Sequence, residues 1–182
     1  MRRREVLAVL AATPLVLVTR GRGAEAADRP LEAIRSGWRE FLPAGLEVPK
    51  PGERVELSEE EWRARLPSLA YRVLREADTE RAFTSPLNEN HERGVYLCAG
   101  CDRPLFTSEM KFDSGTGWPS FFTTIPDAFE TKRDFVLLIP RTEYHCARCG
   151  GHHGHVFGDG PPPTGERWCN NGAALRFVAS AG

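Results

Sequence analysis

Residues 94–101 read Gly-Val-Tyr-Leu-Cys-Ala-Gly-Cys, a short apolar run that ends in a Cys-x-x-Cys pair, Cys98 and Cys101. A second pair, Cys146 and Cys149, follows after 44 intervening residues. Four thiolates at this spacing can complete the tetrahedral shell of one zinc ion, and a closed shell leaves no position open for catalysis. The separation is long for a zinc finger. It predicts instead a clip that joins two hairpins of a single domain.

The chain begins with features of an export signal. The arginines Arg2–Arg4 precede an apolar run, Val6–Val18, and small residues follow it up to Ala26. This order is typical of a cleavable signal peptide, and the paired arginines fit the twin-arginine pattern. An uncleaved anchor is the alternative, but the run is shorter than the about 20 residues that a membrane span needs. We expect residues 1–26 to be a twin-arginine-type signal, and the mature protein to be periplasmic without stable membrane insertion.

Export also bears on the cysteines. Oxidising compartments favour disulfides, so the four paired cysteines can alternatively form two bridges. The repeated Cys-x-x-Cys spacing favours zinc. A twin-arginine signal agrees with zinc, because export in the folded state lets the metal bind before transport.

Composition places the remainder in one domain. Cleavage after Ala26 removes five arginines and two glutamates, which leaves 19 basic and 23 acidic residues, a net charge of −4. Nucleic-acid binding depends on clustered positive charge, so this balance argues against it. About 155 residues suffice for one hydrophobic core, and nothing demands more than a monomer. Residues 27–57 predict an extended lead-in interrupted by a helix over 31–40, and the domain proper is expected over 58–182.

The domain is expected to begin with helices and to continue with strands. Ser58 and Glu61 form a capping-box pattern that predicts a helix to about Leu66, and a second helical stretch follows over 69–76. From Gly94 onward, short apolar or alternating runs are separated by turn residues. The runs lie at 95–98, 135–139, 143–146, 155–157 and 174–178. This pattern predicts a mainly β fold with short N-terminal helices, its antiparallel sheets closed as a sandwich or small barrel.

Cys169 stands apart from the two pairs, within Arg167-Trp168-Cys169-Asn170-Asn171. Read as a strand, this segment places Arg167, Cys169 and Asn171 on one face. A neighbouring guanidinium stabilises a thiolate, so the pattern predicts a raised thiolate fraction near neutral pH. Asn171 offers an amide to hold a substrate or to orient a neighbour. The alternative is a buried structural cysteine, the usual role of a lone cysteine.

Three of the chain's five histidines fall within four residues, at His152, His153 and His155. Because four cysteines already fill a zinc shell, these histidines are either proton donors to a leaving oxygen or part of a solvated glycine-rich turn. The segment Gly115–Ser120 is a turn that presents Trp118. That indole is either core or the apolar wall of a small pocket.

Taken together, these segments resemble the methionine-R-sulfoxide reductases, which act on one sulfoxide epimer of methionine. The resemblance covers about Leu57 to Val178. The motifs that carry it are Glu61-Trp62-Arg63-Ala64-Arg65-Leu66, Tyr71-Arg72-Val73-Leu74-Arg75, Thr79-Glu80, Gly94-Val95-Tyr96-Leu97-Cys98-Ala99-Gly100-Cys101, Lys111-Phe112-Asp113-Ser114-Gly115-Thr116-Gly117-Trp118-Pro119-Ser120-Phe121, Gly154-His155-Val156-Phe157-Gly158-Asp159-Gly160-Pro161, Arg167-Trp168-Cys169-Asn170-Asn171 and Ala174-Leu175-Arg176-Phe177.

The resemblance implies a fold of two antiparallel sheets with N-terminal helices. It also implies one structural zinc ion on Cys98, Cys101, Cys146 and Cys149. The expected substrates are oxidised proteins or peptides that carry methionine-R-sulfoxide. The expected reductant is a thioredoxin-like protein or a low-molecular-weight thiol.

The resemblance further implies residue roles. Cys169 is the nucleophile that attacks the sulfoxide sulfur and becomes a sulfenic acid. His155, with His152, assists protonation of the oxygen, and Trp118 packs against the substrate methyl group. The residues implied to tune the thiolate and its hydrogen-bond network are Arg167, Asp159 and Asn171.

Two positions depart from the family pattern. Many members carry a resolving cysteine where this chain has Thr116, so we expect a one-cysteine enzyme whose sulfenic acid is reduced directly by an external thiol or redoxin. His153 occupies a position where an apolar residue is common.

Two other functions compete with the reductase. A zinc-ribbon interaction module would keep Cys169 buried and inert, but the acidic charge and the Arg-x-Cys-x-Asn segment count against it. A zinc hydrolase would use His152 and His155 as metal ligands, and the filled sulfur shell counts against that.

Overall fold

The computed structural model describes residues 29–134 and 141–180, so the expected signal at 1–26 and the expected strand at 135–139 lie outside the described residues. Its helices are α1 (Leu31–Ser36), η3 (Gly37–Phe41), α2 (Glu59–Arg65), α3 (Ser68–Glu76), η4 (Pro86–Asn88), η5 (Ser108–Met110) and η6 (Gly172–Ala174). Its strands are β1 (Gly94–Cys98), β2 (Pro104–Thr107), β3 (Lys111–Phe112), β4 (Ser120–Phe121), β5 (Phe129–Asp134), β6 (Arg141–Cys146), β7 (His152–Phe157), β8 (Arg167–Asn170) and β9 (Leu175–Ala179).

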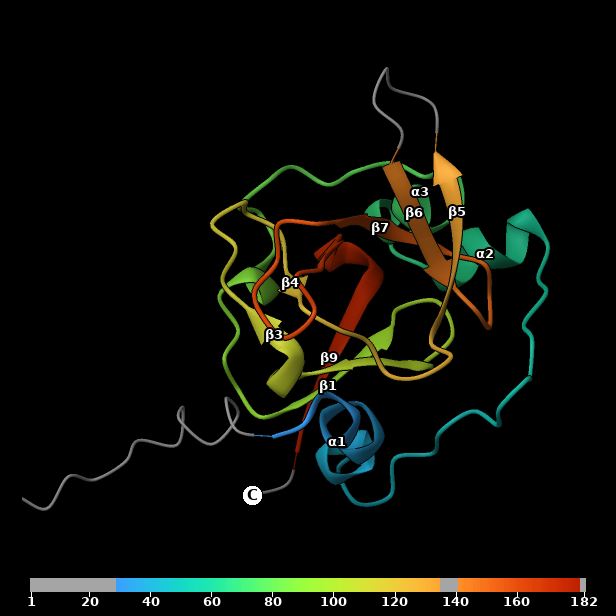
Figure 1. Cartoon of the computed structure of the whole chain (residues 1–182). Helices are drawn as coiled ribbons and strands as arrows, with labels where there is room; N and C mark the ends of the chain where they lie inside the picture. Colours follow the sequence, from blue (N-terminus) through green and yellow to red (C-terminus); the bar gives the residue numbers. More distant parts are fainter. Residues whose placement is uncertain (1–28, 135–140, 181–182) are drawn as a thin grey trace, which may run out of the picture.

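The strands form two antiparallel sheets, as the sequence predicted (Figure 1). Within the described residues, one sheet has three strands in the order β2-β1-β9, and the other has six in the order β3-β4-β8-β7-β6-β5. Aromatic side chains from both sheets fill the space between them. Phe106 of β2 stacks on Phe121 of β4 with ring centroids 3.9 Å apart, and Tyr96 of β1 meets the same ring edge-on.

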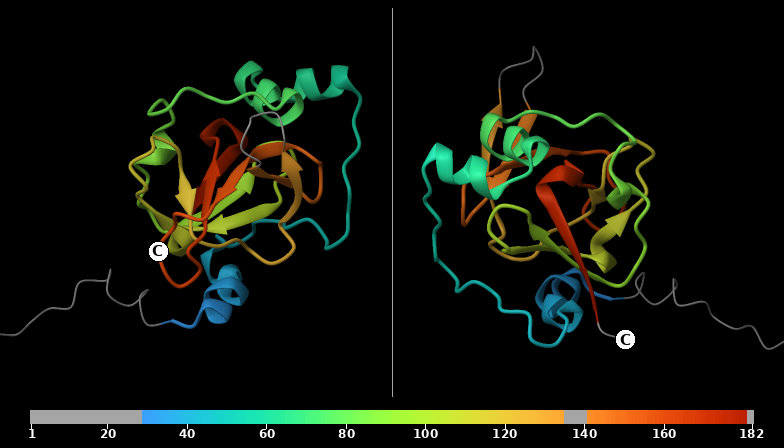
Figure 2. Two further views of the ribbon diagram at one scale, coloured as in Figure 1. Left: turned by 45° about the horizontal axis from the view of Figure 1, so that its top comes forward. Right: turned by 180° about the vertical axis from the view of Figure 1, so that it is seen from behind.

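The helices lie on two sides of this β core. Figure 2 shows α2 and α3 on one side and α1 on the other, joined by an irregular segment that runs along the outside. The capping box is confirmed: Ser58 Oγ accepts from the Glu61 backbone N–H at 3.3 Å, and Glu61 Oε2 accepts from the Ser58 N–H at 2.7 Å. The lead-in helices α1 and η3 also pack against the core, because Ile34 and Phe41 are each only 2% exposed.

Strand register places the proposed nucleophile in the middle of the six-stranded sheet. Cys169 of β8 pairs with Ser120 of β4 on one side and with His155 of β7 on the other. His155 in turn pairs with Glu143 of β6, and Glu143 pairs with Lys132 of β5. Directly opposite residues in antiparallel strands share a face, so the register lines up these polar side chains across the sheet.

Among residues 29–134 and 141–180, no helix has the length and apolar character needed to cross a bilayer.

Candidate active site

A cavity of about 130 Å³ opens where β6, β7 and β8 meet the segment after α3 and the loop before β4. It brings together residues far apart in the sequence, including residues from four of the segments named above. Its lining residues are Thr79, Trp118, Arg141, Gly154, His155, Phe157, Cys169, Asn170 and Asn171. Four of the predicted site residues, Trp118, His155, Cys169 and Asn171, therefore face one small space.

Cys169 is half-buried in this cavity, and its environment pulls its ionisation in two directions. Burial raises the pKa of the thiol, while the charge of Arg167 and hydrogen bonds from Arg167 and Thr116 lower that pKa. Burial prevails, and the pKa of Cys169 stays above its ordinary value. Arg167 thus lowers the pKa of Cys169 as predicted, but the cost of desolvation, which sequence proximity to a cation does not reveal, outweighs its effect.

Arg167 divides its charge between two partners. Its Nε and Nη2 atoms donate to the Asp159 carboxylate at 2.8 and 2.9 Å, a bidentate pair. The same guanidinium lies 4.3 Å above the ring of Phe157, its cross-strand neighbour. Asp159 has a lowered pKa because of these hydrogen bonds, and its negative charge raises the pKa of Cys169. These contacts fix the position of the Arg167 guanidinium, but the Asp159 carboxylate offsets part of the positive charge that acts on Cys169.

The two predicted proton donors occupy different positions. His155 lines the cavity directly opposite Cys169, whereas His152 is buried and its ring centroid lies 5.6 Å from that of His155. His152 Nδ1 and Glu143 Oε1 are 2.8 Å apart, and Glu143 Oε2 lies 3.1 Å from Lys132 Nζ. Burial raises the pKa of Glu143, but the hydrogen bonds from His152 and Lys132 outweigh it and leave that pKa lowered. A carboxylate therefore orients the His152 ring.

Trp118 is fixed by a backbone contact from another segment. Its Nε1 donates to the Glu80 carbonyl oxygen at 3.1 Å, which holds the indole at the cavity wall. The buried Glu80 carboxylate accepts from the backbone N–H groups of Gly172 and Ala173, at 2.5 and 2.8 Å. Glu80 thus ties the tryptophan wall to the chain just beyond Cys169.

Asn171 lies just outside β8, so the expected continuous strand face ends at Asn170. Asn171 Oδ1 accepts from the Glu80 N–H at 2.9 Å, and its Nδ2 donates to the His153 carbonyl at 3.0 Å. Asn171 therefore orients neighbours, the second of the two uses expected for its amide.

Tyr144 holds the backbone at Cys169, because its hydroxyl donates toward the Cys169 carbonyl and the Asn170 amide oxygen, each at 3.0 Å.

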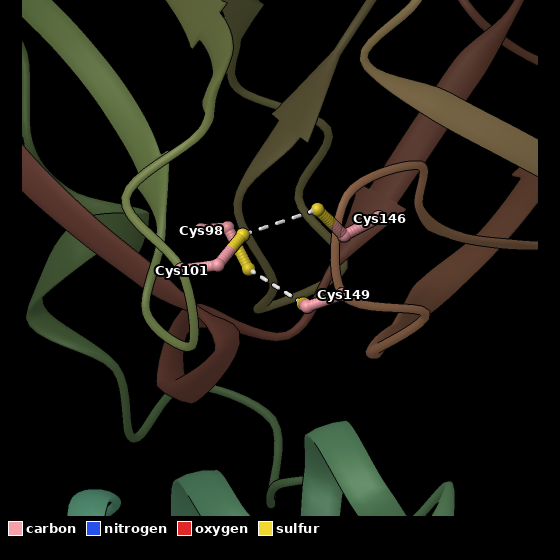
Figure 3. Close-up of side chains that lie close together, drawn as sticks. All are labelled: Cys98, Cys101, Cys146 and Cys149. Atoms are coloured by element: carbon pink, nitrogen blue, oxygen red, sulfur yellow. Dashed lines mark hydrogen bonds between the residues drawn. The ribbon is translucent and has the colours of Figure 1, made fainter. Parts of the chain in front are cut away.

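The four paired cysteines form a second, separate centre. Their sulfur atoms lie within 4.8 Å of one another, and all four residues are buried. Figure 3 shows the two knuckles facing each other, with the Cys98–Cys149 and Cys101–Cys146 sulfurs 3.7 and 3.6 Å apart. Sulfurs around a tetrahedral zinc, with bonds of about 2.3 Å, lie about 3.8 Å apart, whereas a disulfide needs about 2.05 Å. The donor set fits a metal ion.

The cluster also joins the two sheets. Cys98 ends β1 of the three-stranded sheet, and Cys146 ends β6 of the six-stranded sheet. The Arg75 side chain donates to the Cys149 carbonyl at 2.9 Å and so ties α3 to the second knuckle. The predicted clip between distant hairpins corresponds to this arrangement.

Several site residues were not singled out from the sequence. Glu143 and Lys132 join the histidines through strand register, which a sequence without pairing information does not reveal. Arg141, Thr79, Phe157 and Asn170 line the cavity for the same reason. Thr79 and Glu80 were noted within a motif, but no pattern there indicated that Glu80 would hold Trp118.

Comparison with known proteins identifies the family of the chain. Residues 66–179 match the SelR domain. The peptide methionine sulfoxide reductase MsrB of Agrobacterium fabrum is 51% identical over 125 residues, which span 68% of this chain and 93% of that protein. The protein of the same name from Methanosarcina barkeri is 52% identical over 124 residues, spanning 68% of this chain and 87% of that protein. A chloroplastic relative, peptide methionine sulfoxide reductase B1 of Arabidopsis thaliana, is 47% identical over 138 residues, spanning 75% of this chain and 68% of that protein. The chain therefore belongs to the SelR-domain family, the methionine-R-sulfoxide reductases that its motifs resemble.

Proposed function

We propose that this chain reduces the R epimer of protein-bound methionine sulfoxide with Cys169 as its nucleophile and without a resolving cysteine. Membership of the family makes the chain an oxidoreductase that acts on methionine sulfoxide. The observation that carries the residue assignment is the cavity itself, which gathers Cys169, His155 and Trp118 around one small space. A nucleophile, a proton donor and an apolar wall are the groups that this reduction needs.

The proposed chemistry transfers one oxygen atom. The Cys169 thiolate attacks the sulfoxide sulfur while the oxygen takes a proton from His155, whose neighbour His152 is held by Glu143. The oxygen leaves with the Cys169 sulfur as a sulfenic acid, and methionine departs as the thioether. The cysteine sulfur is oxidised by two electrons and the methionine sulfur is reduced by two. An external thiol then displaces water to form a mixed disulfide, and a second thiol releases Cys169.

The one-cysteine assignment rests on where the other sulfurs lie. The chain has five cysteines, and the four others form the buried cluster. Thr116 occupies the expected resolving position and offers a hydroxyl there in place of a thiol. The zinc-module alternative required an inert Cys169 in a protein that is not an enzyme. The zinc-hydrolase alternative required His152 and His155 as metal ligands, but among residues 29–134 and 141–180 the one group of three or more potential metal ligands is the four cysteines.

The metal and the location complete the proposal. The ion held by Cys98, Cys101, Cys146 and Cys149 is one structural zinc, because zinc is the usual occupant of a closed four-thiolate shell. When bound, it fastens the two sheets and takes no part in the reaction. The arginine pair before the apolar run supports periplasmic function after twin-arginine export.

The test compares the mature protein with its Cys169→Ser variant on separated R and S epimers of a methionine-sulfoxide peptide, with dithiothreitol as reductant. Methionine is followed by chromatography, and folding and metal content are checked in both proteins. We expect loss of the R epimer alone, and only with Cys169 present. Equal activity of both proteins would remove Cys169 as the nucleophile, and equal inactivity with intact fold and metal would remove the reductase assignment.

Trapping the intermediate tests the one-cysteine step. One equivalent of R-sulfoxide peptide without reductant is expected to leave Cys169 as a sulfenic acid that dimedone labels, with the metal retained. A disulfide between Cys169 and a cluster cysteine, accompanied by metal release, would contradict the one-cysteine assignment.

A further inference from the structure

Phe83 is an exposed aromatic side chain beside the Cys169 cavity. Among residues 29–134 and 141–180, the two most exposed large apolar residues are Phe83, at 69%, and Leu69 of α3, at 37%. Single exposed apolar residues are common on protein surfaces and need no special explanation. Phe83 differs from Leu69 in its backbone conformation and in its position next to the proposed site.

The backbone of Phe83 is held in an uncommon conformation. Its φ of 63° lies in the left-handed region, which bulky residues seldom adopt and which persists only where surrounding contacts impose it. The Phe83 N–H donates to the Gly117 carbonyl oxygen at 2.8 Å. Three residues earlier, the Glu80 carbonyl oxygen accepts from Trp118 Nε1 at 3.1 Å. Residues 80–83 are therefore attached at both ends to the turn that presents Trp118.

The Phe83 ring packs against the same turn. A Cβ on Gly117 would lie only 2.7–2.8 Å from three carbon atoms of that ring, so the ring lies directly against the glycine. Gly117 itself has a φ of 87°, a second reason why a side chain is disfavoured there. The next residue is Trp118, the proposed substrate wall. Phe83 thus contacts the turn with part of its ring, while most of the residue remains open to solvent.

The size of the cavity determines how much of a substrate it can enclose. Its volume of about 130 Å³ is below the about 300–1,000 Å³ of pockets that enclose a drug-sized ligand. It can therefore take one side chain, while the polypeptide that carries this side chain stays outside. Thr79 and Trp118 form part of the cavity lining. Next to this part of the lining, the outer surface carries Phe83.

We propose that Phe83 is a specificity-determining residue that binds an apolar side chain next to the methionine sulfoxide of a polypeptide substrate. This inference rests on the proposed function. An aromatic ring gains most from covering apolar surface, because the favourable free energy grows with the apolar area removed from water. The ring is also held in place before the substrate arrives, so little conformational freedom is lost on binding.

The position of Phe83 predicts which kinetic constant it affects. The proposed contact lies outside the cavity, so it would be equally strong before and during the reaction at Cys169. Such uniform binding lowers KM and leaves kcat unchanged. A substrate without neighbouring residues cannot make the contact.

The test uses three R-sulfoxide substrates, with dithiothreitol as reductant so that no redoxin has to dock. One peptide has leucine on each side of the methionine sulfoxide, a second has serine there, and the third substrate is the single residue capped as its N-acetyl methylamide. Phe83→Asn removes the ring and tolerates the left-handed backbone. Phe83→Tyr keeps the ring, and Leu69→Ala is the control for loss of an exposed apolar side chain.

We expect the wild type to have a lower KM for the leucine peptide than for the serine peptide. Phe83→Asn should raise the KM for the leucine peptide roughly tenfold, with kcat unchanged and the capped residue unaffected. Phe83→Tyr and Leu69→Ala should behave as the wild type. Equal losses on all three substrates, unchanged constants in Phe83→Asn, or no preference of the wild type for leucine would each overturn the proposal.

Two further measurements separate this inference from the proposed function. Turnover of the capped residue by the wild type tests the reductase assignment without any contact to Phe83. Binding of the leucine peptide to Cys169→Ser, measured by calorimetry with and without Phe83→Asn, tests the contact without turnover. Equal affinities of these two proteins would overturn the role of Phe83 even if the enzyme is active. Phe83→Ala replaces Phe83→Asn if the latter loses its metal or fold.

Discussion

At the scale of single residues, burial decides charge states that sequence neighbours alone suggest incorrectly. Cys169 has a cation two residues away, yet desolvation keeps its pKa raised. His153 is the more extreme case, because it is fully buried between the sheets and desolvation lowers its pKa to about 3. Its Nδ1 lies 3.2 Å from Asn170 Oδ1, and its Nε2 has no partner.

His153 should make stability depend on pH in a defined window. The unfolded histidine binds a proton below about pH 6.5, and the folded one only near pH 3, so the unfolded state binds more protons in between. Stability is then fully present above pH 6.5 and is lost as pH falls toward 3, with a slope of at most about 1.4 kcal/mol per pH unit. His153→Leu should remove this contribution.

Urea denaturation at pH values from 4 to 7 checks this prediction, with the exposed His91→Leu as the control. The free energy of unfolding of the control should follow the wild type. An unchanged pH slope in His153→Leu would show that His153 titrates normally in the folded protein.

At the scale of elements, the close approach of β7 and β8 determines where Cys169 lies. Gly154 pairs with Asn170, and a Cβ on Gly154 would clash with the Cys169 carbonyl oxygen. The obstacle is backbone and cannot rotate away. Tyr144 donates to the same carbonyl, so movement of β8 would also disturb that bond.

Gly154→Ala should therefore separate β7 from β8 and destabilise the protein by about 1–3 kcal/mol, the usual cost of overpacking. R-sulfoxide reduction should fall with it, because Cys169 and His155 lie on these two strands. Gly158→Ala is the matched control, since nothing lies within 4 Å of a Cβ there. Urea denaturation and turnover, measured on both variants, test this prediction. Equal free energies of unfolding for Gly154→Ala and Gly158→Ala would contradict the clash.

Elements with local signals could be predicted from the sequence, and elements made by distant pairing could not. The Ser58 capping box needs only residues three apart, and α2 begins where it indicated. The two-residue strands β3 and β4 are too short to leave an alternating pattern, so they went unpredicted. Of the site residues named from motifs, Trp118, His155, Cys169 and Asn171 line one cavity. Glu143 and Ser120 come near the site only through strand register.

At the scale of the whole molecule, the cysteine cluster holds two sheets that share no strand. Cys98 ends β1 and Cys101 follows it, while Cys146 ends β6 and Cys149 follows it; their buried sulfurs lie within 4.8 Å of one another. Without a metal, the four buried thiols would lie close together and form only weak hydrogen bonds to one another. We therefore expect the metal to contribute to the stability of the entire domain.

Removal of the metal by a chelator under reducing conditions should destabilise the chain by on the order of 10 kcal/mol, the scale of zinc-binding free energies at structural sites. The near-ultraviolet circular dichroism of aromatic residues in both sheets should be lost in a single transition. Metal removal should destabilise the Cys169→Ser variant to the same extent as the wild type, because Cys169 is not part of the cluster. An apoprotein that melts at the holoprotein's temperature would show that the cluster is not a structural metal site.

The pairing of β1 with β9 has a consequence for the order of folding. Cys98 lies opposite Leu175, 77 positions later, so β9 can pair with β1 only when the 76 residues between them have formed a closed loop. Closing long loops costs entropy before any contact repays it, and proteins dominated by such contacts fold slowly. The contact between Cys98 and Cys149 spans only 51 positions. A metal ion bound there early in folding would shorten the loop that remains to be closed before β9 can pair with β1. The metal would then speed folding as well as stabilise the folded protein.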